Sequence, residues 1–148
     1  MMAKLLLVED GTYLRMASKR VLTDAGFSVD EAGDGEEALR VARQSQPDLI
    51  ILDMLLPRLG GERVLRALRQ DPATEDIPVV VLSSLSQSNA PKLKEEGAIA
   101  YMEKSKLDLT TGGDNLVRLV KAALRKAKPE NGAPVPPGQP ELRQTIRR

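Results

Sequence analysis

Five side chains that could carry out acid–base, metal or anion chemistry stand at the ends of short apolar runs in the sequence: Glu9, Asp10, Asp53, Ser83 and Lys104. The clearest run is Leu49 to Leu52, four large apolar residues followed at once by Asp53. An apolar run of this length, bounded by turn-forming residues, predicts a buried strand. Open α/β folds place their ligand sites at the carboxyl ends of parallel strands, so we expect these side chains to share one edge of a sheet.

The residue types at this edge favour a site for a cation and an anion. Three carboxylates held close together repel one another and raise a pKa unless a cation neutralises them. Their oxygen atoms suit a hard cation, Mg²⁺ above all, in a chain without histidine or cysteine. The hydroxyl of Ser83 and the ammonium of Lys104 would add an anion site, and the anion most consistent with this set is a phosphoryl group. Each residue alone has a plain structural explanation, and their coincidence carries the interpretation.

The composition narrows the function classes. The chain has 148 residues, of which 41% are hydrophobic and 29% charged, values that are ordinary for one globular domain. Its net charge of +1 gives no reason to expect nucleic-acid or membrane binding. The absence of histidine and cysteine excludes a histidine general base, a thiol nucleophile and a thiolate metal site. Carboxylates, lysines and hydroxyls must therefore carry any chemistry.

The chain ends predict the domain organisation and the compartment. No apolar run approaches the roughly 20 residues that span a bilayer, and the run after Met1 is too short for a signal peptide. We therefore expect a cytoplasmic protein. Residues 1–128 fit one domain, and the prolines and glycines from Pro129 onward predict an extended tail or linker over residues 129–148.

The elements that must position these side chains alternate along the chain. Short apolar runs predict strands, and apolar residues at helical spacing predict helices between them. The expected strands are 4–8, 27–30, 49–52, 78–82 and 98–102. The expected helices are 14–25, 35–46, 61–71, 85–96 and 116–127, the second beginning at a capping box of Asp34 and Glu37. Five alternations predict an α/β fold with a doubly wound parallel sheet covered on both faces.

Four motifs at the strand ends resemble those of a known family: Leu7-Val8-Glu9-Asp10, Asp53 with Pro57 and Gly61, Leu82-Ser83-Ser84, and Tyr101 three residues before Lys104. Over residues 3–127 the chain is similar to the receiver domain of two-component response regulators. The resemblance implies a flavodoxin-like fold of the single-domain, chemotaxis-regulator type. Its five-stranded parallel sheet would have the order 2-1-3-4-5 and carry five helices.

The resemblance also implies a role for each site residue. Asp53 would accept a phosphoryl group from a phosphohistidine on a histidine kinase or phosphotransfer protein. Asp10 and Asp53 would bind Mg²⁺ with the backbone carbonyl of Leu55, and Glu9 would act largely through water. The protein would assist its own phosphorylation and dephosphorylation without being a turnover enzyme.

Three further residues would report the phosphorylation, again by resemblance. Lys104 would pair with the phosphoryl oxygens, Ser83 would hydrogen-bond one of them, and Tyr101 would be the rotamer switch that turns inward. A new charge of roughly −1.5 to −2 at one strand end would draw in the hydroxyl and the ammonium. The surface built from helix four, strand five and helix five would then bind a downstream protein, with no direct contact to nucleic acid.

The chain departs from the family pattern at several places, among them Gly60, which occupies a position that is commonly acidic. Ser105 follows Lys104, where the family usually has a proline joined by a cis peptide bond, and a non-proline cis bond costs about 2.5–4 kcal/mol. Either the site tolerates that strain or the loop is rebuilt, and the segment 105–114 is a few residues longer than usual. Leu55, two residues after Asp53, offers no polar side chain to orient an attacking water.

Two other functions compete with the phosphoacceptor. A pseudo-receiver would keep the fold as a scaffold for protein interactions without phosphorylation, which Ser105 and the altered loop favour slightly. A Mg²⁺-dependent phosphatase of a related fold would generally carry a second Asp two residues after the nucleophile as acid and base. Leu55 occupies that position and argues against the phosphatase. Pro129 to Pro140 could also be a linker to an output domain.

Overall fold

The structure is a computed structural model, and it describes residues 3–56, 58–83, 94–95, 97–107, 109 and 113–127. Its centre is one sheet of five parallel strands: β1 (Lys4–Val8), β2 (Ser28–Ala32), β3 (Leu49–Asp53), β4 (Val79–Ser83) and β5 (Ala100–Glu103). The strand order is β2-β1-β3-β4-β5, which confirms the predicted fold and order.

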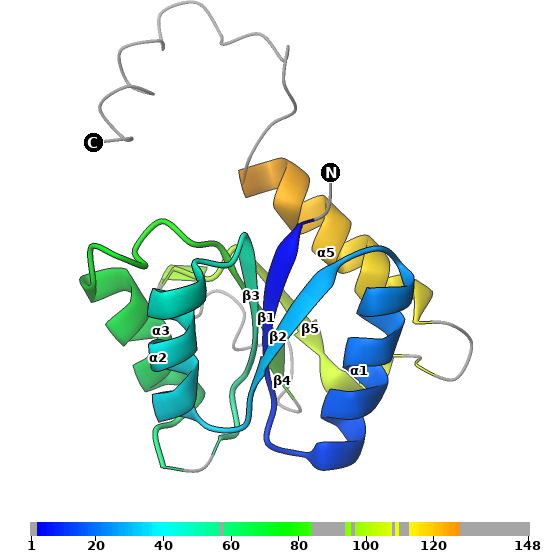
Figure 1. Ribbon diagram of the computed structural model, residues 1–148, viewed down its shortest axis with the longest axis horizontal. Coiled ribbons are helices and arrows are strands. Elements are labelled where there is room, and N and C mark those ends of the chain that lie inside the picture. Colours follow the sequence, from blue (N-terminus) through cyan, green and yellow to red (C-terminus); the bar gives the residue numbers. More distant parts are fainter. Residues whose placement is uncertain are drawn as a thin grey trace, which may run out of the picture.

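Helices cover both faces of the sheet. The described α-helices are α1 (Thr12–Asp24), α2 (Gly35–Ser45), α3 (Gly61–Gln70) and α5 (Asp114–Ala127), and the short 3₁₀ helix η2 (Lys104–Lys106) follows β5. Figure 1 shows α2 and α3 on one face and α1 and α5 on the other. None of the helices in the described part of the chain has the length and apolar character that a membrane span requires.

Some of the predictions fall on other parts of the chain. The fourth predicted helix covers residues 85–96, of which the structure describes only 94 and 95. The predicted tail over residues 129–148 also lies outside the described residues, as do the motif positions Pro57 and Ser84.

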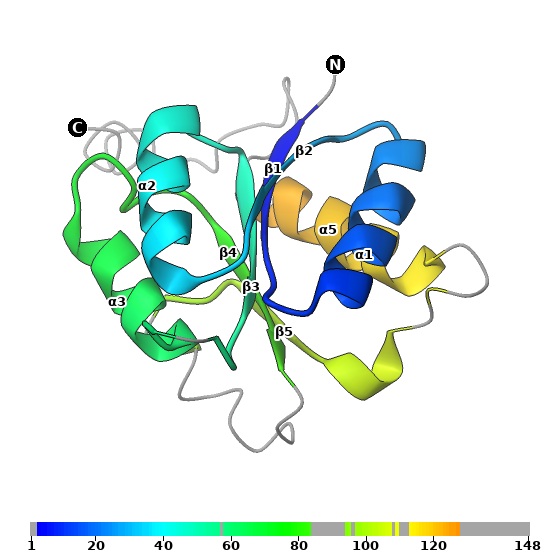
Figure 2. The same ribbon diagram turned by 60° about the horizontal axis from the view of Figure 1, so that its bottom comes forward.

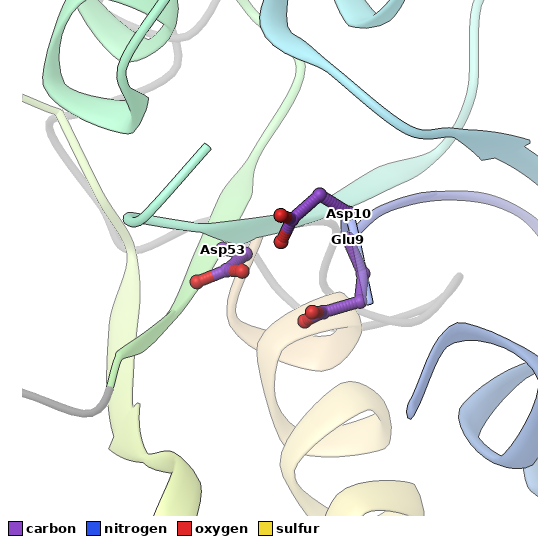
Figure 3. Close-up of side chains that lie close together, drawn as sticks. All are labelled: Glu9, Asp10 and Asp53. Carbon is purple, nitrogen blue, oxygen red and sulfur yellow. The ribbon is translucent and has the colours of Figure 1, made fainter. Parts of the chain in front are cut away.

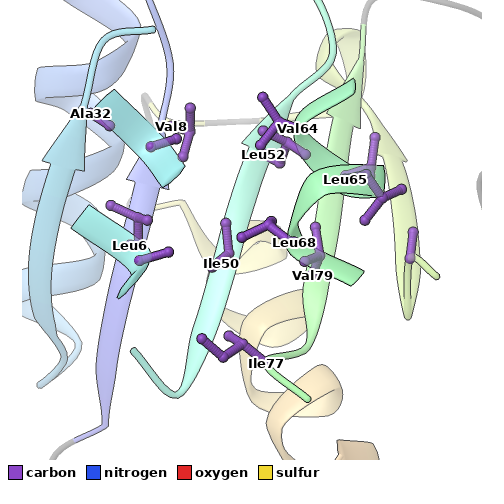
Figure 4. Close-up of a cluster of buried hydrophobic side chains, with 14 of the residues drawn as sticks. Leu6, Val8, Ala32, Ile50, Leu52, Val64, Leu65, Leu68, Ile77 and Val79 are labelled. Carbon is purple, nitrogen blue, oxygen red and sulfur yellow. The ribbon is translucent and has the colours of Figure 1, made fainter. Parts of the chain in front are cut away.

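The three central strands, β1, β3 and β4, bury side chains on both of their faces, as a doubly covered parallel sheet requires. In β1, Leu6 and Val8 join the core on the side of α2 and α3, which Figure 4 shows. Leu5 and Leu7 join the core on the side of α1 and α5. All four are at most 1% exposed. Truncation of such a leucine to alanine costs about 2–5 kcal/mol.

The predicted bounds of the second and fifth strands were wrong by one or two residues at each end. We expected the second strand over 27–30 and the fifth over 98–102, but β2 is Ser28–Ala32 and β5 is Ala100–Glu103. Phe27 and Ala98 are buried, yet each precedes the paired part of its strand. An apolar run in the sequence indicates which residues are buried, whereas a strand is defined by its backbone hydrogen-bond partners. In both cases here, the apolar run therefore starts before the strand does.

The predicted capping box at the start of α2 is present in modified form. Asp34 Oδ1 accepts a hydrogen bond from the Glu37 N–H at 2.8 Å, as predicted. The Glu37 side chain reaches back one residue further than the usual box and accepts from the Gly33 N–H at 2.8 Å. This cap fixes the path from β2 into α2.

Candidate functional site

Three carboxylates lie together at the carboxyl edge of the sheet. Glu9 and Asp10 directly follow β1, and Asp53 is the last residue of the neighbouring strand β3, with Val8 opposite Leu52 in the register. One carboxylate oxygen from each lies within 4.8 Å of the others. Figure 3 shows the three side chains at this edge, and Figure 2 turns the same end of the sheet toward the viewer.

The burial of these carboxylates differs, and it sets their electrostatics. Asp53 is 1% exposed and Glu9 is 4% exposed, while Asp10 is exposed. A buried carboxylate loses most of its hydration and needs hydrogen bonds or a counter-ion in its place. The structure supplies both.

The segment after β1 holds Glu9 by its main chain and by its side chain. The Glu9 N–H donates to the Ala32 carbonyl at 3.0 Å, which continues the β1–β2 ladder by one residue. The Gly11 N–H donates to Glu9 Oε2 at 3.1 Å. The Arg15 guanidinium donates through Nη1 to the Glu9 carbonyl at 2.7 Å. Glu9 is thus fixed on three sides.

The segment after β3 holds Asp53 in a similar way. The Leu55 N–H donates to Asp53 Oδ1 at 3.1 Å, and the Met54 N–H donates to the Leu82 carbonyl at 3.1 Å. Gly61 closes the loop, because its N–H donates to the Met54 carbonyl at 3.2 Å. A Cβ at Gly61 would lie 2.6 Å from Met54 Cα and 2.8 Å from the Asp53 carbonyl oxygen, so the loop requires glycine there.

Lys104 supplies the counter-ion for the two buried carboxylates. Its Nζ lies 2.8 Å from Asp53 Oδ2, 3.0 Å from Glu9 Oε1 and 3.3 Å from Glu9 Oε2. Lys104 is the first residue of η2, directly after β5. Residues from three strand ends therefore meet at one ammonium group.

These contacts shift two pKa values. Burial raises the pKa of Glu9, hydrogen bonds from Lys104 and Gly11 oppose the rise, and the negative charge of Asp53 adds to it. Burial also disfavours the charged form of Lys104, but its hydrogen bonds to Asp53 and Glu9 outweigh that effect and raise the pKa of Lys104. The site is therefore held together by opposite charges in a partly buried setting.

The carboxylate set fits a hard divalent cation. If all three carboxylates are ionised, three negative charges face the single positive charge of Lys104. Oxygen donors from Asp and Glu are the ligands that Mg²⁺ prefers, and exposed Asp10 leaves one side open to water. A Mg²⁺ ion at this edge would neutralise the excess charge.

Ser83 and Tyr101 lie on β4 and β5, the two strands that follow β3 in the sheet order. Ser83 is the last residue of β4 and is fully buried, and in the register it lies opposite Glu103, the residue before Lys104. Tyr101 lies in β5 and packs partly buried against the core under α2 and α3. The structure thus places both near the carboxyl edge, and their proposed roles remain predictions.

The segment that contains Ser105 follows the second of the two alternatives given above, a backbone without the strained cis bond. No cis peptide bond occurs in the described part of the chain, and residues Lys104–Lys106 form η2, which the Leu107 N–H closes onto the Lys104 carbonyl at 3.0 Å. Lys104 still reaches Asp53 in this arrangement. The chain after Lys104 therefore continues without a cis peptide bond, and the ammonium stays at the site.

The sequence analysis missed the group around Arg15. Arg15 Nε lies 3.3 Å from Glu31 Oε1, and Lys19 Nζ lies 2.7 Å from Glu31 Oε2. The sequence did contain a signal for this group. Arg15 and Lys19 are like charges four residues apart on one helix face, and such a pair is destabilising unless an acidic side chain lies opposite. Glu31 on β2 is that acid.

The sequence matches the response regulator receiver domain family over residues 5–110. Among curated proteins it is 34% identical over 131 residues to the response regulator MprA of Mycobacterium leprae, covering 88% of this chain and 54% of that protein. It is also 34% identical to MprA of Mycobacterium tuberculosis strain H37Rv over 134 residues, covering 90% and 55%. The chain thus spans about half the length of the curated relatives that it matches.

Solved structures show the same similarity. The response regulator domain of Thermotoga maritima CheB superposes with a TM-score of 0.74 at 25% identity, covering 84% of this chain and 98% of that one. The chemotaxis protein CheY4 of Vibrio cholerae also superposes with a TM-score of 0.74, at 28% identity, covering 83% and 99%.

Proposed function

The chain belongs to the family of response regulator receiver domains, which serve in phosphorelay signalling, and on that premise we propose that Asp53 accepts a phosphoryl group in a Mg²⁺-dependent reaction. The observation that carries the proposal is the contact set of Asp53. Its Oδ1 accepts from the Leu55 N–H, its Oδ2 contacts the Lys104 ammonium, and two further carboxylates lie beside it. Asp53 is thus a buried acid with one ammonium group in contact and further carboxylates that could share a metal ion with it.

The proposed transfer begins with attack by an Asp53 carboxylate oxygen on the phosphorus of a phosphohistidine. The new O–P bond forms as the P–N bond breaks, and the imidazole leaves with the electron pair. Lys104 already lies 2.8 Å from the attacking carboxylate, so its ammonium would follow the charge onto the phosphoryl oxygens. Before the transfer, hydrogen bonds to both Asp53 oxygens hold the carboxylate in place.

Asp10, Asp53 and the Leu55 carbonyl would hold Mg²⁺, with Glu9 acting through water. Bound Mg²⁺ would supply charge neutralisation for the carboxylates and the incoming phosphoryl group. Glu9 already pairs with Lys104 and Gly11, which fits a role once removed from the ion. Asp10 is the exposed member of the set and has room for a ligand on its open side.

The partners follow from the same premise. A histidine kinase or phosphotransfer protein would supply the phosphoryl group. Ser83 would hydrogen-bond the phosphoryl group, and Tyr101 would turn inward behind it. The surface of helix four, β5 and α5 would carry the change to a downstream protein, although the predicted fourth helix lies largely outside the described residues.

Incubation with Mg²⁺ and acetyl phosphate tests the proposal. Intact mass should increase by one phosphoryl group in the wild type, and the increase should disappear in Asp53→Asn and after chelation of Mg²⁺. A wild type without mass gain or Mg²⁺ binding would contradict the proposal and favour the non-phosphorylated scaffold. Rapid multiple turnover of a phosphate ester would instead favour a phosphatase, which Leu55 argues against, since its exposed apolar side chain stands where such enzymes carry an acid.

A further inference from the structure

We propose that Arg15 is a positioning residue of the phosphoacceptor site, which orients the peptide group between Glu9 and Asp10 so that the Asp10 carboxylate faces Asp53. The inference rests on the proposed function, because Asp10 is assigned there as a Mg²⁺ ligand. It concerns a side chain on α1 that touches none of the three carboxylate groups.

The Glu9–Asp10 peptide depends on Arg15. Arg15 Nη1 donates to the Glu9 carbonyl at 2.7 Å, and that carbonyl belongs to the peptide bond that leads into Asp10. The Glu9 N–H donates to the Ala32 carbonyl at 3.0 Å on the other side of the residue. The guanidinium and β2 together therefore fix the main chain at the point where it leaves the sheet.

Asp10 has little else to hold it. Its side chain is exposed, and no hydrogen bond to its carboxylate occurs within the described part of the chain. The direction of the Asp10 side chain is consequently set by the backbone that carries it. A rotation of the Glu9–Asp10 peptide would move the one carboxylate that is open to solvent away from Asp53.

Arg15 is itself held in place by an acid on β2. Its Nε lies 3.3 Å from Glu31 Oε1, while Lys19 Nζ occupies Glu31 Oε2 at 2.7 Å. Glu31 pairs with Leu7 in the strand register, close to the end of β1. The planar guanidinium contacts Glu31 through one nitrogen and the Glu9 carbonyl through another, a pair of directed contacts that one lysine ammonium reproduces poorly.

Substitution of Arg15 tests the inference, with Lys19 as the matched control. Arg15→Met should weaken Mg²⁺ binding about tenfold in calorimetric titrations, the usual scale for loss of an outer hydrogen bond that orients a metal ligand. Lys19→Met removes the same charge from the same cluster without touching Glu9, and should leave the affinity within about twofold of wild type. Arg15→Lys should fall between Arg15→Met and the wild type.

Two further readouts separate positioning from a loss of stability. In amide NMR spectra of the metal-free protein, Arg15→Met should move the signals of Asp10 and Gly11 strongly and Lys19→Met should not. With acetyl phosphate, Arg15→Met should raise the Mg²⁺ concentration needed for half-maximal phosphorylation while the rate at saturating Mg²⁺ stays near that of wild type. Thermal melting of both variants shows whether either has lost its fold.

The outcomes distinguish this inference from the proposed function. Wild-type Mg²⁺ affinity and unmoved Asp10 signals in Arg15→Met would overturn the role of Arg15, even if Asp53 is phosphorylated normally. Equal losses of Mg²⁺ affinity in Arg15→Met and Lys19→Met would show that only the net charge matters. That result would also overturn the positioning role of Arg15. Failure of the wild type to gain a phosphoryl group would overturn the proposed function, while the affinity and NMR comparisons would still decide whether Arg15 orients Asp10.

Discussion

Lys104 Nζ lies 2.8 Å from Asp53 Oδ2, although β4 separates the strands that carry the two residues. The lysine reaches over the end of β4 because it begins η2 directly beyond β5. The same ammonium contacts Glu9, so the two most buried acids of the site share it as their counter-ion. Lys104 is thus a structural counter-ion before it is a ligand for any phosphoryl group.

Lys104→Met should destabilise the metal-free protein by about 2 kcal/mol at neutral pH, because loss of one partner leaves buried carboxylates without their counter-ion. Chemical denaturation with and without Mg²⁺ measures this effect, and saturating Mg²⁺ should restore part of the loss. Lys106→Met, at an exposed position two residues away, is the control and should change little. Equal stability of the Lys104 and Lys106 variants would show that the pairing contributes nothing.

Gly61→Ala should lower the free energy of unfolding by about 1–3 kcal/mol, since its Cβ would overlap backbone atoms of Met54 and Asp53 that cannot move freely. Gly60→Ala is the matched control, because a Cβ there meets nothing within 4 Å. Its effect as an N-cap substitution should stay below about 1 kcal/mol. Denaturation curves of the two variants compare them directly, and a more harmful Gly60→Ala would contradict the packing of the loop after β3.

Glu31→Gln should reduce stability at neutral pH by less than about 1 kcal/mol, because solvent screens its partly exposed ion pairs. The hydrogen bond from Lys19 lowers the pKa of Glu31 from its ordinary value of 4.5 against the opposing effect of burial. A lowered pKa in the folded state means that the contribution is present above the unfolded value and is lost as the pH falls through the folded value. Unfolding curves of wild type and variant should therefore converge in acid, and a gap that widened there would have the wrong sign.

Mg²⁺ should stabilise the wild type by mass action, by about 2.7 kcal/mol at a concentration one hundred times its dissociation constant. Asp10→Asn should lose most of this stabilisation while folding normally, since Asp10 is exposed and its own contacts are few. Thermal melting across a Mg²⁺ titration, reversed by a chelator, measures both. If Mg²⁺ stabilised Asp10→Asn as much as the wild type, the cation would have to bind somewhere other than this edge of the sheet.

The fold could be predicted from the sequence because apolar runs and helical spacing alternate without interruption. Leu49 to Leu52 reads as a buried strand before any neighbour is known, and Glu9, Asp10 and Asp53 follow from the rule that parallel strands end at one edge. The strand order itself came with the family resemblance. Strand ends were less predictable, as Phe27 and Ala98 show, because burial extends beyond backbone pairing.

The parts of the site that escaped prediction depend on geometry across elements. Arg15 acts through the carbonyl of Glu9, a group that every residue has, so no residue type marks the contact. For the chain after Lys104, the sequence left open whether the loop is strained or rebuilt. The structure answers this by showing the helix η2 there. The residue types at strand ends can be recognised in the sequence as candidate site residues. Contacts to backbone atoms cannot, because every residue has the same backbone atoms.

Localisation of the phosphoryl group tests the central claim most directly. After incubation with acetyl phosphate and Mg²⁺, borohydride reduction converts an acyl phosphate on Asp to homoserine, and peptide mass mapping then identifies the modified residue. We predict that the modification falls on Asp53 alone, the buried acid that Lys104 and Leu55 hold in place. Modification at Asp10 or Glu9, or none under conditions in which Mg²⁺ binds, would contradict the account.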